Sequence, residues 1–404
     1  MQAVIMVAGK STRTYPLTLT RPKALLKIAN KTILEHQLEA LRGLVNEIVL
    51  VVWYRKNMIH ERFGDSFGGV PIRYVDQADQ LGTGHAVLQC KSVVKGPFLA
   101  MNGDDLYDPK DLARLAEVEQ GALAKAVDDP RLYGIYEVKD GHAVRIVEKP
   151  DEVFSNLANV GAYKFAPDVF DVLERIRPSE RGELEVTCAV QALADRGGFR
   201  VLEMGGYWLP IGYPWHVLAA NEFWLEHFLE HKIEGEVSPA AHLNGRVYVA
   251  PGAIVRSGVV IDGPVYIGRG ASIGPNAFIR PCTTIGDHCK IGHAVEIKNS
   301  VFFDHAAAPH LSYVGDSVVG EKVNLGAGTI TANFRHDGKR IGSYVKDGMV
   351  DTGRRKFGAI FGDEVHTGIN TSIYPGRKFW PHTFSYPGES IRKDVTEVKR
   401  LPQS

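Results

Sequence analysis

The feature that most constrains the fold is an apolar residue at every sixth position through the middle of the chain. The series is Val249, Val255, Ile261, Ile267, Ile273, Ile279, Ile285, Ile291 and Ile297. Neither the 3.6-residue period of a helix nor the two-residue period of a strand produces a strict six. A parallel β-helix does, because each side of a triangular coil takes one hexapeptide and turns its apolar residue inward. One coil cannot bury its own apolar face, so the segment must fold as a stack of coils.

The series stops near Phe303 and returns in a shifted register. The later members are Val319, Leu325 and Thr331, followed by Phe361, Thr367, Ile373, Phe379 and Ser385. We therefore expect two loops to leave the stack, over residues 302–313 and 332–356. Loops on a rigid repeat scaffold frequently carry function.

The bulk composition excludes several classes of protein. Lys plus Arg and Asp plus Glu number 47 each, so the net charge is zero, which argues against a nucleic-acid or membrane-surface partner. The four cysteines (Cys90, Cys188, Cys282 and Cys289) form no CxxC pair, which argues against a structural zinc site and fits a reducing cytoplasm. No run of 18 apolar residues predicts a membrane span, and no N-terminal signal peptide is expected.

The first half has a different architecture. Strand patterns at 2–7, 47–52, 71–75 and 97–102 alternate with helical patterns at roughly 31–43, 56–63 and 84–93. Such alternation is typical of a doubly wound, mainly parallel, Rossmann-like α/β sheet, which binds ligands beyond the carboxyl ends of its strands. An amphipathic helix is expected over 214–231 and a linker over 234–239. The sequence thus predicts an α/β domain at 1–232, a β-helix of hexapeptide repeats at 240–390 and a C-terminal tail at 391–404.

Candidate phosphate-binding residues follow the first strand. The loop around Gly9 has little side-chain bulk, which lets backbone N–H groups approach phosphate oxygens. Arg13 and Lys23 add positive charge where a leaving pyrophosphate would become negative. Asp104 lies just after the strand at 97–102, where a carboxylate can hold Mg²⁺ against nucleotide phosphates.

The stretch AGKSTRTYPLTLTRPKALL resembles the signature of the sugar-phosphate nucleotidylyltransferases. The resemblance implies that Asp104 is the metal ligand, with Asp105 a lesser candidate. It implies that Gln77, Gly82 and Thr83 face the pyrimidine, and Thr83 could also cap its own helix. The residues that it places at the sugar are Gly134, Glu148, Lys149 and Asn159, with Lys149 on the sugar phosphate.

This sequence departs from that family at two points. Ser11 stands where the family commonly has Gly. More seriously, Pro210 occupies the position of an Asp that is often the second metal ligand, in the stretch Trp208-Leu209-Pro210-Ile211-Gly212. Proline has no side-chain ligand, so the metal keeps an extra water, another carboxylate substitutes, or nucleotidyl transfer is weakened.

The second half carries another set of motifs, Ala308–Asp316 and Val323–Phe334. They resemble the acetyltransferase half of the bifunctional glucosamine-1-phosphate acetyltransferase / N-acetylglucosamine-1-phosphate uridylyltransferase family. A neutral imidazole can take the proton of an amine that attacks a thioester, so His310 is the candidate base. By this resemblance Arg280 and Lys298 bind the sugar phosphate. Four more residues position the sugar and thioester: Tyr313, Asn324, Asn333 and Lys339.

The family fold implied is a left-handed β-helix that assembles as a homotrimer or a multiple of it, with small-molecule substrates. The leading hypothesis is a bifunctional enzyme that acetylates glucosamine-1-phosphate with acetyl-CoA. It then uses Mg²⁺ and UTP or dTTP to make a nucleotide sugar. One alternative is a glucose-1-phosphate uridylyl- or thymidylyltransferase whose β-helix only forms trimers. The other is a non-enzymatic regulatory relative, which the Pro210 substitution favours slightly.

Overall fold

The structure is a computed structural model that describes residues 1–179 and 181–398. It divides into two compact units. The first contains Met1–Lys10, Pro22–Leu25 and Ile33–Pro210, and the second contains Ser11–Arg21, Leu26–Thr32 and the chain from Ile211 onward. The N-terminal signature segment is therefore shared between the units.

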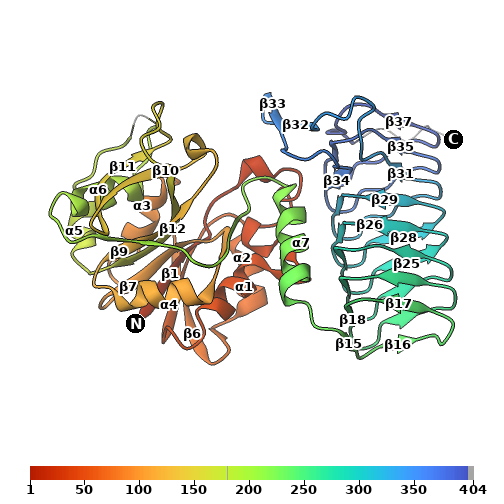
Figure 1. The fold of residues 1–404 in the computed structure, drawn as a ribbon, viewed down its shortest axis with the longest axis horizontal. Helices are drawn as coiled ribbons and strands as arrows, with labels where there is room; N and C mark the ends of the chain where they lie inside the picture. Colours follow the sequence, from red (N-terminus) through yellow and green to blue (C-terminus); the bar gives the residue numbers. More distant parts are fainter. Residues whose placement is uncertain (180, 399–404) are drawn as a thin grey trace. The chain divides into compact units, whose positions relative to one another are not determined.

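The first unit is built on one ten-stranded sheet (Figure 1). Its strand order is β10-β11-β13-β9-β12-β7-β1-β4-β6-β5. The strands are β1 (Gln2–Met6), β4 (Glu47–Val52), β5 (Ser66–Phe67), β6 (Val70–Asp76), β7 (Phe98–Asn102), β9 (Gly121–Ala126), β10 (Gly134–Lys139), β11 (His142–Glu148), β12 (Leu157–Phe165) and β13 (Arg200–Glu203).

Helices cover both faces of this sheet, as the strand pattern requires. Val4 and Ala100 pack in one core with α3 (Thr83–Leu88), α5 (Val169–Leu173) and α6 (Val186–Ala194). Ala3 and Leu99, their chain neighbours, pack in the other core with α1 (Ile33–Ala40), α2 (Lys56–Phe63) and α4 (Pro109–Glu117). Successive side chains of a strand point to opposite faces, so a strand buried on both faces is apolar throughout.

The parallel order predicted from the sequence holds for β7, β1, β4 and β6. From β10 onward most pairs are antiparallel, as in β10–β11 and β12–β7. The turn at Asp140-Gly141 joins β10 directly to β11 without a crossover helix, and a short hairpin connection can join only antiparallel strands.

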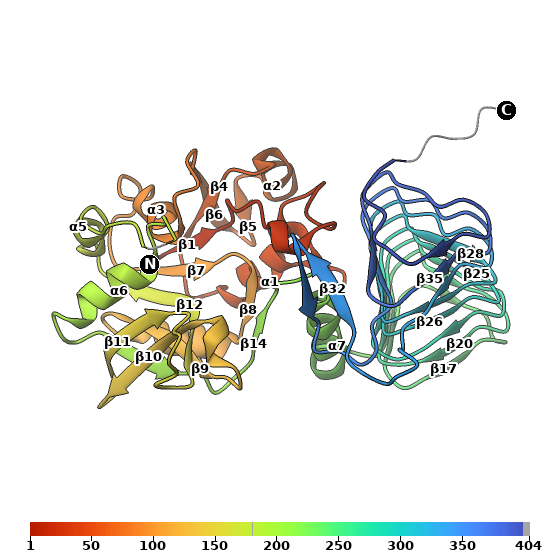
Figure 2. The ribbon, with the colours of Figure 1, turned by 90° about the horizontal axis from the view of Figure 1, so that it is seen from above.

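The second unit contains three parallel sheets (Figure 2). From β15 to β30, consecutive strands lie in different sheets and every third strand returns to the same sheet. This arrangement is compatible with the predicted β-helix, and one coil here means three consecutive strands. The first sheet comprises β15 (Lys232–Ile233), β18 (Val247–Val249), β21 (Val265–Ile267), β24 (Thr283–Ile285), β27 (Val301–Phe302), β30 (Val318–Val319), β34 (Ala359–Phe361) and β36 (Arg377–Phe379).

The other two sheets complete each coil. The second comprises β16 (Glu236–Val237), β19 (Ile254–Val255), β22 (Ser272–Ile273), β25 (Lys290–His293) and β28 (Ala307–His310). The third comprises β17 (His242–Asn244), β20 (Val260–Asp262), β23 (Phe278–Ile279), β26 (Glu296–Lys298), β29 (Tyr313–Gly315), β31 (Ile330–Thr331), β35 (Ser372–Ile373) and β37 (Ser390–Ile391).

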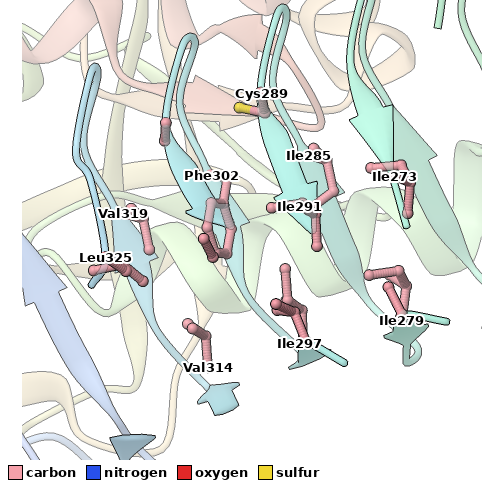
Figure 3. Close-up of a cluster of buried hydrophobic side chains, with 14 of the residues drawn as sticks. Ile273, Ile279, Ile285, Cys289, Ile291, Ile297, Phe302, Val314, Val319 and Leu325 are labelled. Carbon is pink, nitrogen blue, oxygen red and sulfur yellow. The ribbon is translucent and has the colours of Figure 1, made fainter. Parts of the chain in front are cut away.

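The hexad residues form the core of this unit. All nine members from Val249 to Ile297 are buried, each with at most 1% of its surface exposed. Figure 3 shows Ile279, Ile285 and Ile291 pointing into a common interior, where they pack in layers. Full burial of an apolar side chain contributes roughly 1.5–3 kcal/mol, so the repeat supplies most of the driving force for this unit.

One predicted loop is wrong and the other is confirmed. Residues 302–313 do not leave the stack, because β27, β28 and β29 continue it with Phe302, Ala308 and Val314 buried inside. The six-residue period breaks because Phe302 follows Ile297 after five positions instead of six, and because Ala308 is small. Residues 332–356 do leave the stack, and they carry the antiparallel hairpin of β32 (Gly342–Val345) and β33 (Gly348–Asp351).

The predicted linker at 234–239 is also wrong. β16 lies within it and pairs with β19, so these residues already belong to the first coil. The segment resembles a linker because its strand is only two residues long. A C-terminal tail was predicted at 391–404. Within it, the backbone of Val395 is hydrogen-bonded to the backbones of Lys378 and Trp380. Residues 399–404 lie outside the described part of the chain.

A row of acidic side chains along one edge of the second unit holds the N-terminal segments that belong to it. The acids stand on successive coils. Asn30 Nδ2 donates to Asp287 at 2.8 Å, Lys27 Nζ to Asp304 at 2.6 Å, and Arg21 Nη2 to Glu321 at 3.0 Å and Asp363 at 2.6 Å. We call Asp287, Asp304, Glu321 and Asp363 the acidic edge.

Within the described residues, no helix is both long and apolar enough to cross a membrane.

Candidate functional sites

The first candidate site lies at the carboxyl ends of β1 and β7. Lys23 Nζ donates to Asp104 Oδ2 at 2.5 Å; the Lys23 side chain is 6% exposed and that of Asp104 37%. Gln37 on α1 fixes the turn that carries Asp104, since its Nε2 donates to the carbonyls of Asn102 and Asp105. The sequence predicted both Lys23 and Asp104 here, and the structure brings them together. Gly9 follows β1 and is exposed.

The carboxylates at this strand end differ in their fitness for a metal. Mg²⁺ is usually held by one or two carboxylates together with substrate phosphates and water. Asp104 fits that role because its carboxylate is partly exposed at the strand end. Asp105 is buried, accepts from Trp208 Nε1 and Tyr107 Oη at 3.3 Å each, and faces Pro210 across β8 (Asp105–Tyr107) and β14 (Trp208–Pro210). Burial and the nearby Asp104 charge raise the pKa of Asp105 to about 8. Because Asp105 is buried and bonded to Trp208 and Tyr107, its carboxylate is less accessible to a metal than that of Asp104.

The predicted base-reading segment packs against residues 183–187, at the start of α6. Gln77 is buried, and its Nε2 donates to Gly82 O at 3.0 Å. A Cβ on Gly82, whose φ is +111°, would lie 2.7 Å from Leu184 O, so this approach requires glycine. The prediction that Thr83 caps its own helix is wrong. Thr83 is the first residue of α3, and its Oγ1 accepts from Val186 N at 3.1 Å, which satisfies a donor at the start of α6.

The predicted sugar residues lie on β10, β11 and β12. Gly134 stands opposite Glu148 in the β10–β11 register. Glu148 Oε1 lies 3.4 Å from Arg181 Nη2, and burial raises the pKa of Glu148. Asn159 is engaged internally, donating to Tyr163 Oη at 2.7 Å and accepting from Gly161 N at 3.1 Å. Lys149 is exposed beside Glu148 in the chain.

Arg13 belongs to the second unit. It is exposed, with its guanidinium carbon 5.7 Å from the centre of the Tyr213 ring. This placement fits a cation that rests on an aromatic face, an interaction worth about 0.5–1 kcal/mol at an exposed site.

The second candidate site centres on Asp316. Its carboxylate is 2% exposed and accepts from Asn333 Nδ2 at 2.6 Å and Asn299 Nδ2 at 2.9 Å, with Lys298 Nζ at 3.5 Å. Asn333 Nδ2 also donates to Tyr313 Oη at 3.1 Å. A Cβ on Gly315 would lie 2.5 Å from Tyr313 Oη, so the close packing needs glycine there. Two predicted residues, Lys298 and Asn333, therefore meet at one carboxylate, and Asn333 links the third, Tyr313, to this cluster.

Arg280 lies on the same sheet. Its Nη1 donates to Glu296 Oε1 at 2.8 Å, and Glu296 is the register partner of Tyr313. Arg280 and Lys298 thus stand on successive coils of one face, each beside an acid.

His310 ends β28 at a corner of its coil, next to Leu311, and it is exposed. Its ring has no hydrogen-bond or ion-pair partner among the residues that the structure describes. Asn324 lies one coil after His310. It forms a parallel β-bridge with Ala307, which belongs to β28, the strand that His310 ends. Lys339 is exposed in the 332–356 insertion, where its backbone N–H donates to Asp337.

Sequence reasoning missed Asp316 and Glu296 as site residues. Asp316 ends the Ala308–Asp316 motif, but its residue type does not predict burial. The one signal that could have indicated its contact with Asn299 is their 17-residue spacing, which places both at the same corner of consecutive coils. Glu296 carried no signal beyond its place beside Ile297.

The comparisons with known proteins match both halves of the chain. A family model for nucleotidyl transferases matches residues 2–227, and a model described as "GMPPB C-terminal domain" matches residues 261–382. The "Bifunctional protein GlmU" of Methanococcus vannielii is 40% identical over 98% of this chain and 96% of its own. The "Bifunctional sugar-1-phosphate nucleotidylyltransferase/acetyltransferase" of Sulfurisphaera tokodaii is 38% identical over 98% of each chain. The "Low-salt glycan biosynthesis nucleotidyltransferase Agl11" of Haloferax volcanii is 34% identical over 84% of this chain.

The two relatives that are 40% and 38% identical match residues of both units. Each unit also contains one of the two clusters of candidate residues. A relative that resembled only the nucleotidyl transferase half could not account for the Asp316 cluster or for the repeat beneath it. Since the similarity spans nearly the full length of both partners, the chain belongs to the bifunctional sugar-1-phosphate nucleotidylyltransferase/acetyltransferase family.

Proposed function

We propose that this enzyme acetylates glucosamine-1-phosphate with acetyl-CoA and then joins the product to UTP. The products are UDP-N-acetylglucosamine, CoA and pyrophosphate. Residues 1–232 would carry nucleotidyl transfer and residues 240–390 acetyl transfer. The observation that carries the substrate assignment is the Asp316 cluster, which presents Lys298, Tyr313 and Asn333 together beside Arg280.

In nucleotidyl transfer, a phosphate oxygen of the sugar phosphate attacks the α-phosphorus of the nucleotide. The bond to the bridging oxygen breaks, and pyrophosphate leaves. Lys23 and Arg13 supply positive charge for the leaving group, and Gln77 and Gly82 shape the base site. Asp104 would hold Mg²⁺, which shields the mutual repulsion of the phosphates. No general base is needed, because the sugar phosphate is already a nucleophile.

In acetyl transfer, the substrate amine attacks the carbonyl carbon of the thioester. His310 takes the proton from nitrogen as the C–N bond forms. The C–S bond then breaks, and the leaving thiolate of CoA takes the proton from His310. Arg280 and Lys298 hold the sugar phosphate, while Asn324 and Lys339 are candidates for contacts with the sugar and thioester.

We further propose that the three-sheet unit is a left-handed parallel β-helix and that the enzyme is a homotrimer or a multiple of it. Exposed apolar side chains near the second site support assembly, since Leu311 is 61%, Ile330 41% and Phe334 47% exposed. Light scattering should give three times the 44.5 kDa chain mass, or six times it. A monomer would contradict the assembly proposal alone.

The two reactions can be tested separately on the full chain. The first assay measures CoA release from acetyl-CoA with glucosamine-1-phosphate. The second measures pyrophosphate release from UTP, dTTP, CTP or GTP with N-acetylglucosamine-1-phosphate. His310→Asn should lower only the first rate and Lys23→Ala only the second, each by more than about 100-fold, as expected for removal of a proton acceptor or a charge stabiliser. The activity that each variant retains shows that it is folded.

Each alternative has its own outcome. Absence of CoA release by the unmodified enzyme would support the single-activity transferase with a structural repeat. Absence of turnover with every nucleotide would support the regulatory relative. A preference for dTTP over UTP would leave the two reactions standing and correct the nucleotide.

A further inference from the structure

The second unit contains a cavity of about 690 Å³, and Arg13 is the only one of its lining residues that we assign to either reaction. Its walls come from four places in the chain. They are the 3₁₀ turn at Thr12–Thr14, the β32–β33 hairpin, β36, and the segment that follows β37. All of its lining residues belong to the second unit. Its volume lies within the usual range for small-molecule sites, roughly 300–1,000 Å³.

The lining is strongly basic in a chain whose net charge is zero. Six cationic side chains line the cavity, against the single carboxylate of Asp394. They are Arg13, Lys346, Arg377, Lys378, Arg392 and Lys393. They come from separate segments that only the tertiary fold brings together, so a basic stretch of sequence does not explain the cluster.

Most of these cations are not neutralised by the protein. Among the residues that the structure describes, Lys378 is the only one of the six with a carboxylate within 4 Å. Arg392 rests against the ring of Tyr374, and Arg13 against that of Tyr213. Like charges around one cavity repel each other, and this cost falls when an anion binds between them.

Lys378 is built into the wall rather than lying on the surface. Its side chain is 3% exposed, its Nζ donates to the carbonyl of Tyr344, and Asp394 Oδ2 lies 3.8 Å away. The Trp380 ring centre is 5.4 Å from the same Nζ. Burial lowers the pKa of Lys378 and raises that of Asp394, so each ion of the pair is disfavoured by its surroundings.

We propose that this cavity binds a diphosphate or longer phosphate chain, held by Arg377, Lys378, Arg392 and Lys393. Several cations on different elements suit an anion with several charged oxygens better than a monoanion. The chain could be free or part of a nucleotide, because the aromatic side chains of Tyr15 and Trp380 also line the cavity. The proposal does not rest on either of the enzyme's two reactions.

Trp380 provides a local probe for the test. Inorganic pyrophosphate is titrated into the full-length protein at constant ionic strength, and tryptophan emission is recorded. The same titration with Trp380→Phe is subtracted, which removes signal from any pyrophosphate bound at the nucleotidyl-transfer site. We expect a saturable difference signal whose dissociation constant is at least tenfold lower for pyrophosphate than for sulfate.

A pair of matched variants then tests the assignment. Arg392→Gln/Lys393→Gln should weaken pyrophosphate binding at least tenfold and leave both enzymatic activities unchanged. Arg256→Gln/Arg269→Gln removes the same charge from exposed positions outside this cavity and should change nothing. Arg13 is left intact because it is also a candidate for nucleotidyl transfer.

The outcomes separate the possibilities. Equal binding by both variant pairs, or equal affinity for sulfate and pyrophosphate, would overturn the proposal in favour of non-specific ion binding. Tighter binding of uridine or adenosine diphosphate than of pyrophosphate would assign the ligand as a nucleotide. Equal or weaker binding of these nucleotides would assign the unsubstituted phosphate chain.

Discussion

Arg21 donates from Nη2 to Asp363 Oδ2 at 2.6 Å, although 342 positions separate them in the chain. The same nitrogen lies 3.0 Å from Glu321, and the Arg21 side chain is 9% exposed. Removing one partner of a buried ion pair leaves the other charge uncompensated, whereas exposed pairs contribute little. Arg21 is thus an anchor that ties the N-terminal signature segment to the acidic edge.

The first prediction concerns the stability of this anchor. Asp363→Asn keeps the shape but removes one of the two carboxylates at Arg21, and Glu321 still offsets part of the guanidinium charge. We therefore expect a loss of about 1.5–3 kcal/mol in unfolding free energy. Asp171→Asn is the matched control, because its carboxylate is 64% exposed and lies 3.7 Å from Lys91. That control should change stability by less than about 0.5 kcal/mol. Denaturant unfolding of both variants measures the difference, and equal losses would contradict the anchoring role.

The second prediction concerns Asp316, which we expect to position Lys298 and Asn333 for the sugar phosphate. Asp316→Asn should raise the KM for glucosamine-1-phosphate by about tenfold, because loss of one charge-assisted contact costs about 1.4 kcal/mol or more. The kcat of acetyl transfer should change far less. Asp262→Asn, an exposed carboxylate bonded to Asn244 on the same sheet, is the control. A fall in kcat with unchanged KM would reject the positioning role.

The third prediction concerns Pro210. It stands opposite Asp105 at the strand end that carries Asp104. Pro210→Asp adds a carboxylate near the candidate metal ligand, so the Mg²⁺ concentration that gives half-maximal nucleotidyl transfer should fall severalfold. Pro210→Ala also removes the proline ring but adds no side-chain oxygen, so it should leave that concentration unaltered. An equal response of the two variants would show that position 210 does not face the metal.

The fourth prediction concerns the thiols. Burial raises the pKa of Cys90 and Cys282 to about 12 and also raises the pKa of Cys289. A raised thiol pKa means less of the reactive thiolate at pH 8. We therefore expect Ellman's reagent to modify at most Cys188 in the native protein, and all four cysteines after denaturation. Peptide mapping identifies the modified position; rapid native labelling of Cys90 or Cys289 would contradict the buried placement.

The sequence determined the repeat and both candidate sites in outline. A strict six-residue period admits few solutions, so the core residues from Val249 to Ile297 follow from the period alone. Lys23 and Asp104 could be paired from the sequence because motifs that follow parallel strands meet at one edge of the sheet. Local patterns of this kind depend on residues close together in the chain.

Only the tertiary structure decided which distant residues share a partner. It showed that residues 302–313 continue the stack. The turn at Asn299 is one residue shorter than the preceding turns, which shifts the six-residue period without ending the strand pairing. It made Asp316 a buried hub and Thr83 a partner of α6. It also assigned Arg21 to the acidic edge and gathered six cations around one cavity. Several of these relationships join residues more than 100 positions apart, as between Thr83 and Val186 or between Arg21 and Asp363. Charge or polarity in a sequence does not reveal which side chains burial and chain path will bring within hydrogen-bonding distance.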